Sequence, residues 1–122
     1  MGAKRILYVE DERIFALEMR YILEGLGYTV AASVATGEEA IEMLHEHSPD
    51  IVMMDIKLGG KLDGIDAAKL IRKTNPSIPL IYITGIVDER LEESMAATAP
   101  YQLIRKPIDE QKLAEALKQV LQ

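Results

Sequence analysis

The stretch Ile51-Val52-Met53-Met54-Asp55 decides the fold, because four apolar residues in a row end at a carboxylate. A short, continuous apolar run is typical of a strand that other elements cover on both faces. The runs Ile6–Val9 and Leu80–Ile83 have the same character. We therefore predict that these three runs are the central strands of a parallel sheet.

Two weaker runs complete the predicted sheet. Residues Tyr28–Val34 are rich in β-branched side chains and half polar, which suits a strand at the edge of a sheet. Leu103-Ile104 is a short fifth candidate, and Pro107 ends the stretch that follows it.

A helical pattern follows each of these strands. Between Asp11 and Leu26 the apolar residues recur at the three- and four-residue spacing of one helix face, and Gly27 suits the position just after the helix end. The other predicted helices cover residues 36–47, 63–73, 88–97 and 109–121.

Strand and helix thus alternate five times. This alternation predicts a parallel sheet with helices on both faces, and right-handed crossovers leave few topologies for it. We predict an α/β fold of the flavodoxin-like (βα)5 type, a three-layer sandwich with a parallel five-stranded sheet in the order 2-1-3-4-5. That order places the half-polar second strand at an edge. We expect residues 1–122 to form a single domain, because 122 residues is an ordinary domain length.

The composition excludes several classes of protein. The chain is 48% apolar and 28% charged, as in ordinary soluble globular domains. Its net charge of −6 disfavours direct binding to nucleic acid or to an anionic membrane. No apolar run approaches the roughly 18 residues of a membrane span. The absence of cysteine excludes disulfides and thiolate chemistry. We expect a soluble, intracellular protein.

Chemically useful side chains follow the predicted strands. Glu10 and Asp11 follow the first strand, Asp55 the third, Thr84 the fourth and Lys106 the fifth. Strand carboxyl ends meet at one edge of such a sheet, where clustered carboxylates repel one another unless a hard cation such as Mg²⁺ joins them. An aspartate can accept a phosphoryl group, whose oxygens the metal, ammonium and hydroxyl would hold. We therefore predict Mg²⁺-dependent phosphoryl chemistry here.

Four segments resemble the receiver domain of two-component response regulators, the family that includes chemotaxis regulators. They are Ile6 to Glu12 (ILYVEDE), Ile51 to Asp55 (IVMMD), Leu80 to Gly85 (LIYITG) and Arg105 to Pro107 (RKP). No single motif is specific, but four of them in order, each at a strand end, are strong together. The resemblance covers residues 4–121. It implies a signalling phosphoacceptor that catalyses only its own phosphorylation and dephosphorylation, rather than an enzyme.

The resemblance also implies roles for the matching residues. Asp55 is the expected phospho-acceptor, taking its phosphoryl group from the histidine of a sensor kinase or of a phosphotransfer domain. Glu10 and Asp11 are expected to hold Mg²⁺ (or Mn²⁺) together with Asp55, and Lys57 to lend its backbone carbonyl to the metal. Thr84 is then the expected switch hydroxyl.

Lys106 matches the lysine of the family, and the bond from it to Pro107 is usually cis there. Phosphorylation is expected to shift an equilibrium between inactive and active conformations. An output protein or domain would read the surface of the fourth helix, fifth strand and fifth helix. The resemblance further implies a cytoplasmic monomer or weak dimer. It does not name the kinase, the output or the phosphoryl lifetime, which Lys57 and Ile86 beside the site would influence.

Two features depart from the family pattern. Leu103 occupies the position of the usual switch aromatic, while Tyr101 lies two residues earlier and on the same strand face. The segment from Asp55 to Asp63-Gly64 is one residue longer than the common spacing, and Gly59-Gly60 within it favours a mobile loop.

Simpler interpretations and other functions stand beside this one. Asp55 by itself is compatible with a turn cap, and Glu12 is expected to be an exposed residue of a first helical turn. A receiver fold that is never phosphorylated would serve as an interaction module, which the intact acidic residues disfavour and Leu103 slightly favours. A Mg²⁺-dependent phosphohydrolase would typically carry its nucleophile after the first strand instead.

Overall fold

Strands and helices alternate along the whole of the computed structural model, which describes residues 2–85 and 87–121. The strands are β1 (Arg5–Val9), β2 (Thr29–Val34), β3 (Ile51–Asp55), β4 (Leu80–Thr84) and β5 (Gln102–Arg105). The helices are α1 (Arg13–Gly25), α2 (Gly37–His47), α3 (Gly64–Thr74), α4 (Glu89–Ala96) and α5 (Glu110–Val120).

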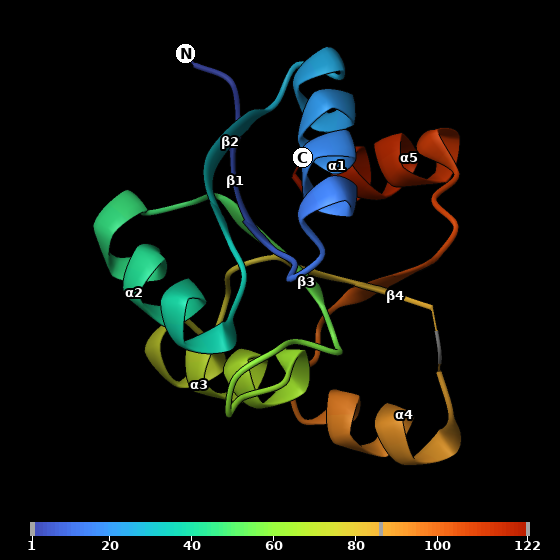
Figure 1. Ribbon diagram of the computed structural model, residues 1–122. Helices are drawn as coiled ribbons and strands as arrows, with labels where there is room; N and C mark the ends of the chain where they lie inside the picture. Colours follow the sequence, from blue (N-terminus) through green and yellow to red (C-terminus); the bar gives the residue numbers. More distant parts are fainter. Residues whose placement is uncertain (1, 86, 122) are drawn as a thin grey trace.

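The five strands of the described residues form one parallel sheet in the order β2-β1-β3-β4-β5 (Figure 1). This confirms the predicted fold class, strand order and edge position of the second strand. The central strands β1, β3 and β4 are buried almost throughout, as their continuous apolar runs predicted.

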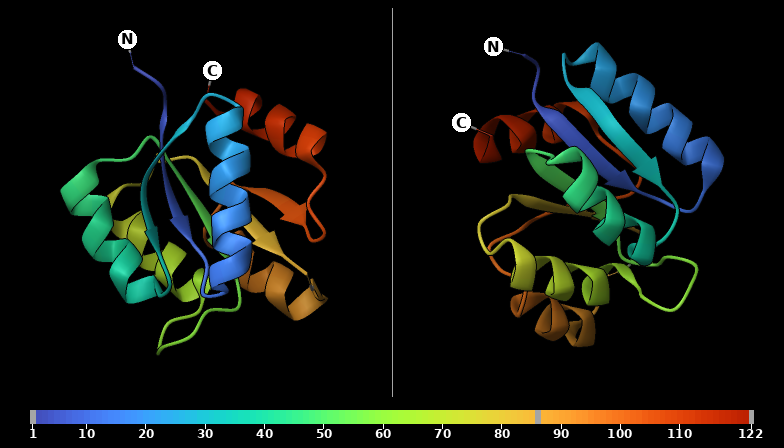
Figure 2. Two further views of the ribbon diagram at one scale, coloured as in Figure 1. Left: turned by 45° about the horizontal axis from the view of Figure 1, so that its top comes forward. Right: turned by 90° about the vertical axis from the view of Figure 1, so that its left-hand side faces the viewer.

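Helices cover both faces of the sheet (Figure 2). Alternate residues of each strand point to opposite faces, so the core divides into two apolar clusters. One cluster joins Ile6, Met53 and Ile83 to α1 and α5, and the other joins Leu7, Met54 and Tyr82 to α2, α3 and α4. This three-layer arrangement leaves the ends of the strands accessible at the two edges of the sandwich.

Capping side chains begin four of the helices at the residues where the sequence predicted a start. Thr36, Asp63, Asp88 and Asp109 each accept a hydrogen bond from a backbone N–H of the first turn. Such a bond satisfies one of the amides that have no partner within the helix. These caps fix where each helix begins and therefore the length of the loop before it.

The first helix begins two residues later than predicted. Glu12 is the N-cap of α1, in extended conformation and without a side-chain capping bond, so the prediction of Glu12 as a first-turn residue is wrong. The cause is Glu10, whose carboxylate accepts a hydrogen bond from the Glu12 N–H at 3.2 Å and keeps residues 10–12 out of the helix. Gly27 follows the helix end with φ of 97°, in the left-handed conformation expected for that position.

None of the helices in the described part of the chain has the length and apolar character that crossing a bilayer requires.

Candidate functional site

A cleft of about 320 Å³ opens at the carboxyl ends of the central strands. It is lined by Asp11, Glu12, Asp55, Lys57, Thr84, Gly85 and Lys106. A water molecule occupies about 30 Å³ of liquid, so the cleft has room for a phosphoryl group together with a hydrated ion. The topology explains its place, because β1, β3 and β4 are neighbours and end at the same edge.

Three carboxylates meet beside this cleft. One oxygen from each of Glu10, Asp11 and Asp55 lies within 4.8 Å of the others. Glu10 and Asp55 are buried, whereas Asp11 is exposed. Oxygens of this kind and spacing fit a hard divalent cation such as Mg²⁺, which prefers carboxylate ligands and retains water. The donor set therefore fits the metal that the sequence predicted.

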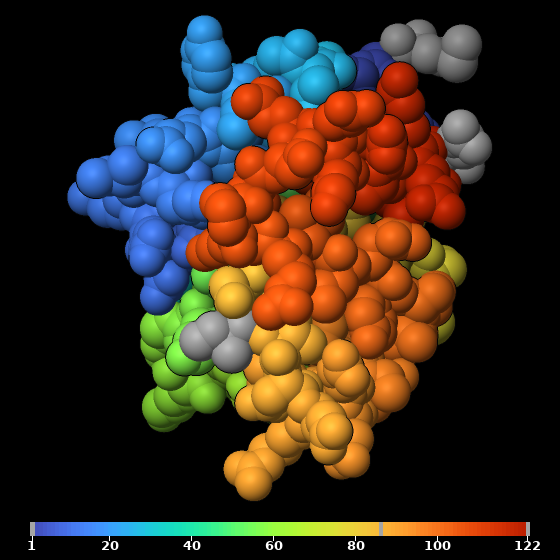
Figure 3. All heavy atoms as spheres, turned by 90° about the vertical axis from the view of Figure 1, so that its right-hand side faces the viewer, coloured from blue at the N-terminus to red at the C-terminus, as the bar shows by residue number. Residues whose placement is uncertain are grey.

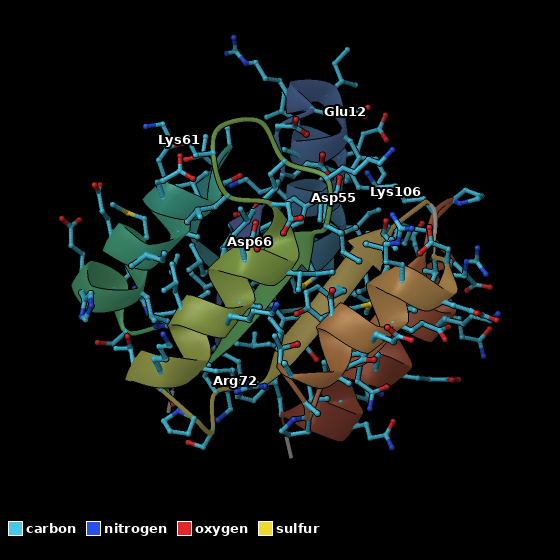
Figure 4. The ribbon with its side chains drawn as sticks, turned by 90° about the horizontal axis from the view of Figure 1, so that it is seen from below. Glu12, Asp55, Lys61, Asp66, Arg72 and Lys106 are labelled. Carbon is cyan, nitrogen blue, oxygen red and sulfur yellow. The ribbon has the colours of Figure 1, made fainter. Side chains whose placement is uncertain are left out.

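Lys106 connects two of these carboxylates. Its Nζ donates to Asp55 Oδ2 at 3.1 Å and to Glu10 Oε1 at 3.2 Å. The ammonium also lies 4.3 Å from the centre of the Phe15 ring on α1, a cation–π distance. Figure 4 shows the labelled Asp55 and Lys106 next to each other at this edge of the sheet. The bond from Lys106 to Pro107 is cis, as the resemblance implied, and so is that from Ala99 to Pro100.

The clustered charges perturb one another. Burial raises the pKa of Glu10 to about 6, the charge of Asp55 also raises it, and hydrogen bonds from the Glu12 N–H and Lys106 oppose the rise. Burial alone would lower the pKa of Lys106, but the hydrogen bonds to Asp55 and Glu10 and the charges of both carboxylates raise it overall. The lysine is therefore held as a cation beside Glu10, whose burial makes its carboxylate costly to ionise.

Tyr8 is a neighbour of the site that the sequence analysis did not single out. Its hydroxyl donates to Glu10 Oε1 over 3.5 Å, and burial strongly raises the pKa of this phenol. The signal was present, since Tyr8 lies two residues before Glu10 and alternate strand residues share a face. Phe15 carried no such signal, because its contact with Lys106 joins α1 to the far end of the chain.

Thr84 and Lys57 also lie at the cleft. Thr84 ends β4, is buried, and accepts a hydrogen bond on its backbone oxygen from the Lys106 N–H at 2.8 Å. Lys57 is exposed and lines the same cleft as Asp55. Ile86, which the sequence analysis placed beside the site, lies outside the described residues.

Tyr101 directly precedes β5 and packs against Tyr82 of β4. Leu103 pairs with Tyr82 across β4 and β5, and Tyr101 packs on the same face. The rings of Tyr82 and Tyr101 meet edge to face with centroids 5.3 Å apart. The Tyr82 hydroxyl and Thr98 Oγ1 are hydrogen-bonded at 2.6 Å. Tyr101 is thus packed against Tyr82, which lies two residues before Thr84 on the same strand.

Comparisons with known proteins identify the family to which the chain is similar. The family model for the response regulator receiver domain matches residues 6–118. The chain is 32% identical over 117 residues to the chemotaxis protein CheY of Thermotoga maritima, covering 96% of this chain and 97% of that protein.

Solved structures are similar along nearly the whole chain. The signal receiver domain of a modulated diguanylate cyclase from Desulfovibrio desulfuricans is 31% identical with a TM-score of 0.90, over 98% of this chain and 94% of that one. A chain in the CheX-CheY-BeF3-Mg complex of Borrelia burgdorferi is 25% identical with a TM-score of 0.91, over 99% and 91%.

Proposed function

The chain belongs to the response regulator receiver domain family, and we propose that it is a phosphoacceptor that takes a phosphoryl group onto Asp55. The donor is the phosphohistidine of a sensor kinase or of a phosphotransfer domain. The observation that carries the proposal is the meeting of Asp55 with Glu10, Asp11 and Lys106 at one edge of the sheet. We take residues 1–122 as one receiver domain, acting in the cytoplasm.

The proposed reaction is a transfer between two protein side chains. An oxygen of the Asp55 carboxylate bonds to phosphorus as the bond from phosphorus to the histidine nitrogen breaks. The electron pair of that bond goes to the imidazole nitrogen, which then takes a proton from water. The signal ends by hydrolysis: water attacks phosphorus, the bond from phosphorus to the Asp55 oxygen breaks, and Asp55 returns to a carboxylate with release of inorganic phosphate.

Lys106 and Thr84 are the groups of this chain that would hold the transferred phosphoryl oxygens. Lys106 Nζ already lies 3.1 Å from Asp55 Oδ2, so its charge is in place before the negative group arrives. Thr84 lines the same cleft and offers a hydroxyl to an oxygen there. Preorganised charge of this kind is most of what a protein contributes to phosphoryl transfer.

The carboxylates of Glu10, Asp11 and Asp55 would bind Mg²⁺ or Mn²⁺, with the backbone carbonyl of Lys57 as a further ligand. When bound, the ion supplies positive charge to the phosphoryl oxygens and removes the repulsion among the carboxylates.

Phosphorylation would then shift the chain toward a conformation that an output partner recognises. The surface we assign to that partner consists of α4, β5 and α5, which Figure 3 shows as one continuous face. Tyr101 is engaged with Tyr82, which pairs with Leu103 between β4 and β5. We expect a monomer or weak dimer.

A second surface supports a protein as the phosphodonor. Ile14, Leu17 and Tyr21 form an apolar stripe along α1 and are 75%, 68% and 82% exposed. Their spacing of three and four residues puts them on one side of the helix. Leu17 of the stripe lines a cleft together with Glu10 and Asp11, so a protein donor packed on the stripe would lie next to the acidic site.

The proposal is tested by intact mass after incubation with acetyl phosphate and Mg²⁺. One added phosphoryl group is expected on the parent chain, none without Mg²⁺ and none in Asp55→Asn. Asp88→Asn is the matched control, because asparagine also caps a helix and residue 88 is not among those that line the cleft. No added mass on the parent would instead indicate an interaction module that is not phosphorylated. Rapid release of phosphate from a phosphate ester would indicate a phosphohydrolase.

A further inference from the structure

The loop of residues 57–63 connects β3 to α3, and its first residue, Lys57, lines the cleft. Its two ends are held together at the base, where the Gly64 N–H donates to the Ile56 oxygen at 2.7 Å. A side chain on Gly64 would collide with the Asp55 carbonyl, so this close approach requires glycine. Figure 4 shows the loop arching out past the labelled Lys61 and returning toward Asp66.

The outer part of this loop is attached to the start of α2. Gly59 forms a parallel bridge with Thr36, and the Leu62 N–H donates to Glu38 Oε1 at 3.1 Å. Gly60 has φ of 88°, and a Cβ there would lie 2.9 Å from Glu38 Oε2. The sequence favoured a mobile loop at Gly59-Gly60, whereas the loop has specific contacts with residues more than twenty positions earlier.

The same loop lies against a carboxylate of the proposed metal site. A Cβ on Gly59 would be 3.8 Å from Asp11 Oδ2, and Lys57 at the start of the loop lines the cleft. A displacement of the loop would therefore move Lys57 and Gly59 relative to Asp11. Glu38 is the side chain that opposes such a displacement, because it accepts the N–H of Leu62 at the far end of the loop.

An acidic residue in the first turn of a helix needs no further explanation, since it interacts favourably with the helix dipole. Glu38, however, directs both carboxylate oxygens at the loop rather than into solvent alone. Glu42, one turn later on α2, is exposed as Glu38 is, but its side chain makes no hydrogen bond or ion pair within the described residues. Glu38 and Glu42 thus lie on the same helix, but only the Glu38 carboxylate contacts the loop within the described residues.

We infer that Glu38 is a positioning residue for the metal site: through Leu62 it holds the 57–63 loop, and hence Lys57 and Gly59, in place beside Asp11. This inference rests on the proposed function, because it assumes that Mg²⁺ binds at Glu10, Asp11 and Asp55. It adds a residue that does not itself touch the metal or the phosphoryl group.

The test compares the parent with Glu38→Ala, Glu38→Gln and Glu42→Ala. Hydrogen exchange at the Leu62 amide reports the attachment of the loop, and calorimetric titration with MgCl₂ reports metal affinity. In Glu38→Ala we expect faster exchange at Leu62 and Mg²⁺ affinity lower by about fivefold, the equilibrium equivalent of one exposed hydrogen bond. Glu38→Gln keeps an oxygen that accepts the Leu62 N–H, so both readouts should return to within about twofold of the parent. Glu42→Ala should match the parent.

Three results would overturn the inference. Equal Mg²⁺ affinity in the parent and Glu38→Ala would show that the loop needs no such attachment. Equal losses in Glu38→Ala and Glu38→Gln would show a charge effect instead of positioning. Absence of Mg²⁺ binding in the parent would remove this inference and the proposed function together. In the first two cases, phosphorylation of the parent by acetyl phosphate would still support the proposed function.

Discussion

At the scale of single residues, the site depends on one ammonium between two buried carboxylates. Lys106 is within hydrogen-bonding distance of both Glu10 and Asp55, and about a quarter of its side chain remains exposed. Partly exposed ion pairs contribute little on their own. The larger effect appears when the cation is removed, because the carboxylates are then left close together in a buried place.

Lys106→Ala should therefore destabilise the metal-free chain, by about 1–3 kcal/mol at pH 7.5, since the pair is only partly buried. The pKa of Glu10 is about 6 in the folded chain, above its ordinary value, so its contribution to stability is fully present below pH 4.5 and lost as the pH rises through 6. Removing Lys106 raises this pKa further. The deficit should consequently be smaller at pH 5 than at pH 7.5.

The measurement is urea unfolding in EDTA at both pH values, with Lys112→Ala as the control. Lys112 is exposed on α5, and its side chain is outside the cleft of the acidic site. A deficit of the same size at pH 5 and pH 7.5 would contradict the account of Lys106 as the counterion of Glu10.

At the scale of elements, a second cation joins segments that the sheet does not connect. Arg72 near the end of α3 donates to the backbone oxygens of Thr98, Ile78 and Pro100 at 2.9, 2.6 and 2.6 Å. These oxygens belong to the loop before β4 and to the loop between α4 and β5. The guanidinium thus joins the segments that lead into β4 and β5, at the amino ends of the strands, whereas the acidic site lies at their carboxyl ends.

Arg72→Met should destabilise the chain by about 1–3 kcal/mol, because methionine keeps much of the apolar stem but leaves these carbonyls without their donor. Lys73→Met is the matched control, since Lys73 is the next residue and is exposed. Urea unfolding measures both. Equal, small effects for the two variants would mean that water replaces the guanidinium at no cost.

For the apolar stripe on α1 we predict, in contrast to Arg72, little effect of substitution on stability. Leu17→Ser and Tyr21→Ser should change the free energy of unfolding by less than about 0.5 kcal/mol, because both side chains are largely exposed. Leu23→Ala, on the buried face of the same helix, should cost about 2–5 kcal/mol. A loss above 1 kcal/mol for the stripe would show that it serves the fold rather than a partner.

At the scale of the whole molecule, the metal should stabilise the fold by mass action. Mg²⁺ at a hundred times its dissociation constant should add about 2.7 kcal/mol to the free energy of unfolding. Asp11→Asn should lose most of this gain because it removes a proposed ligand, whereas Asp88→Asn should keep it. Thermal unfolding with and without MgCl₂, at matched ionic strength, measures the difference. The same gain in all three chains would indicate a general salt effect.

Much of this architecture was predictable because its signals are local. Continuous apolar runs identify buried parallel strands, and Asp63, Asp88 and Asp109 identify helix starts. The strand order then brings Glu10, Asp55 and Lys106 to one edge without further information. The nearness of Tyr8 to Glu10 could also have been predicted, because alternate residues of a strand share a face, although the sequence analysis did not single out Tyr8.

Other contacts were not predictable, because they depend on how distant segments pack. Nothing in the sequence distinguishes Arg72 from an exposed helix residue. Its partners are backbone oxygens, which any residue type provides. The contact of Glu38 with Leu62 joins the first turn of α2 to a loop 24 residues later in the chain. Glu12 was misplaced because the carboxylate of Glu10 bonds to its amide and delays the start of α1.

The central claim is that Asp55 itself accepts the phosphoryl group. After incubation with acetyl phosphate and Mg²⁺, borohydride reduces an aspartyl phosphate to the alcohol and releases phosphate, which leaves homoserine at the modified position. Peptide mass spectrometry then locates it. The account predicts homoserine at position 55, dependent on Mg²⁺ and lost in Asp55→Asn. Homoserine at another carboxylate, or none on a chain that gains no phosphoryl group, would contradict it.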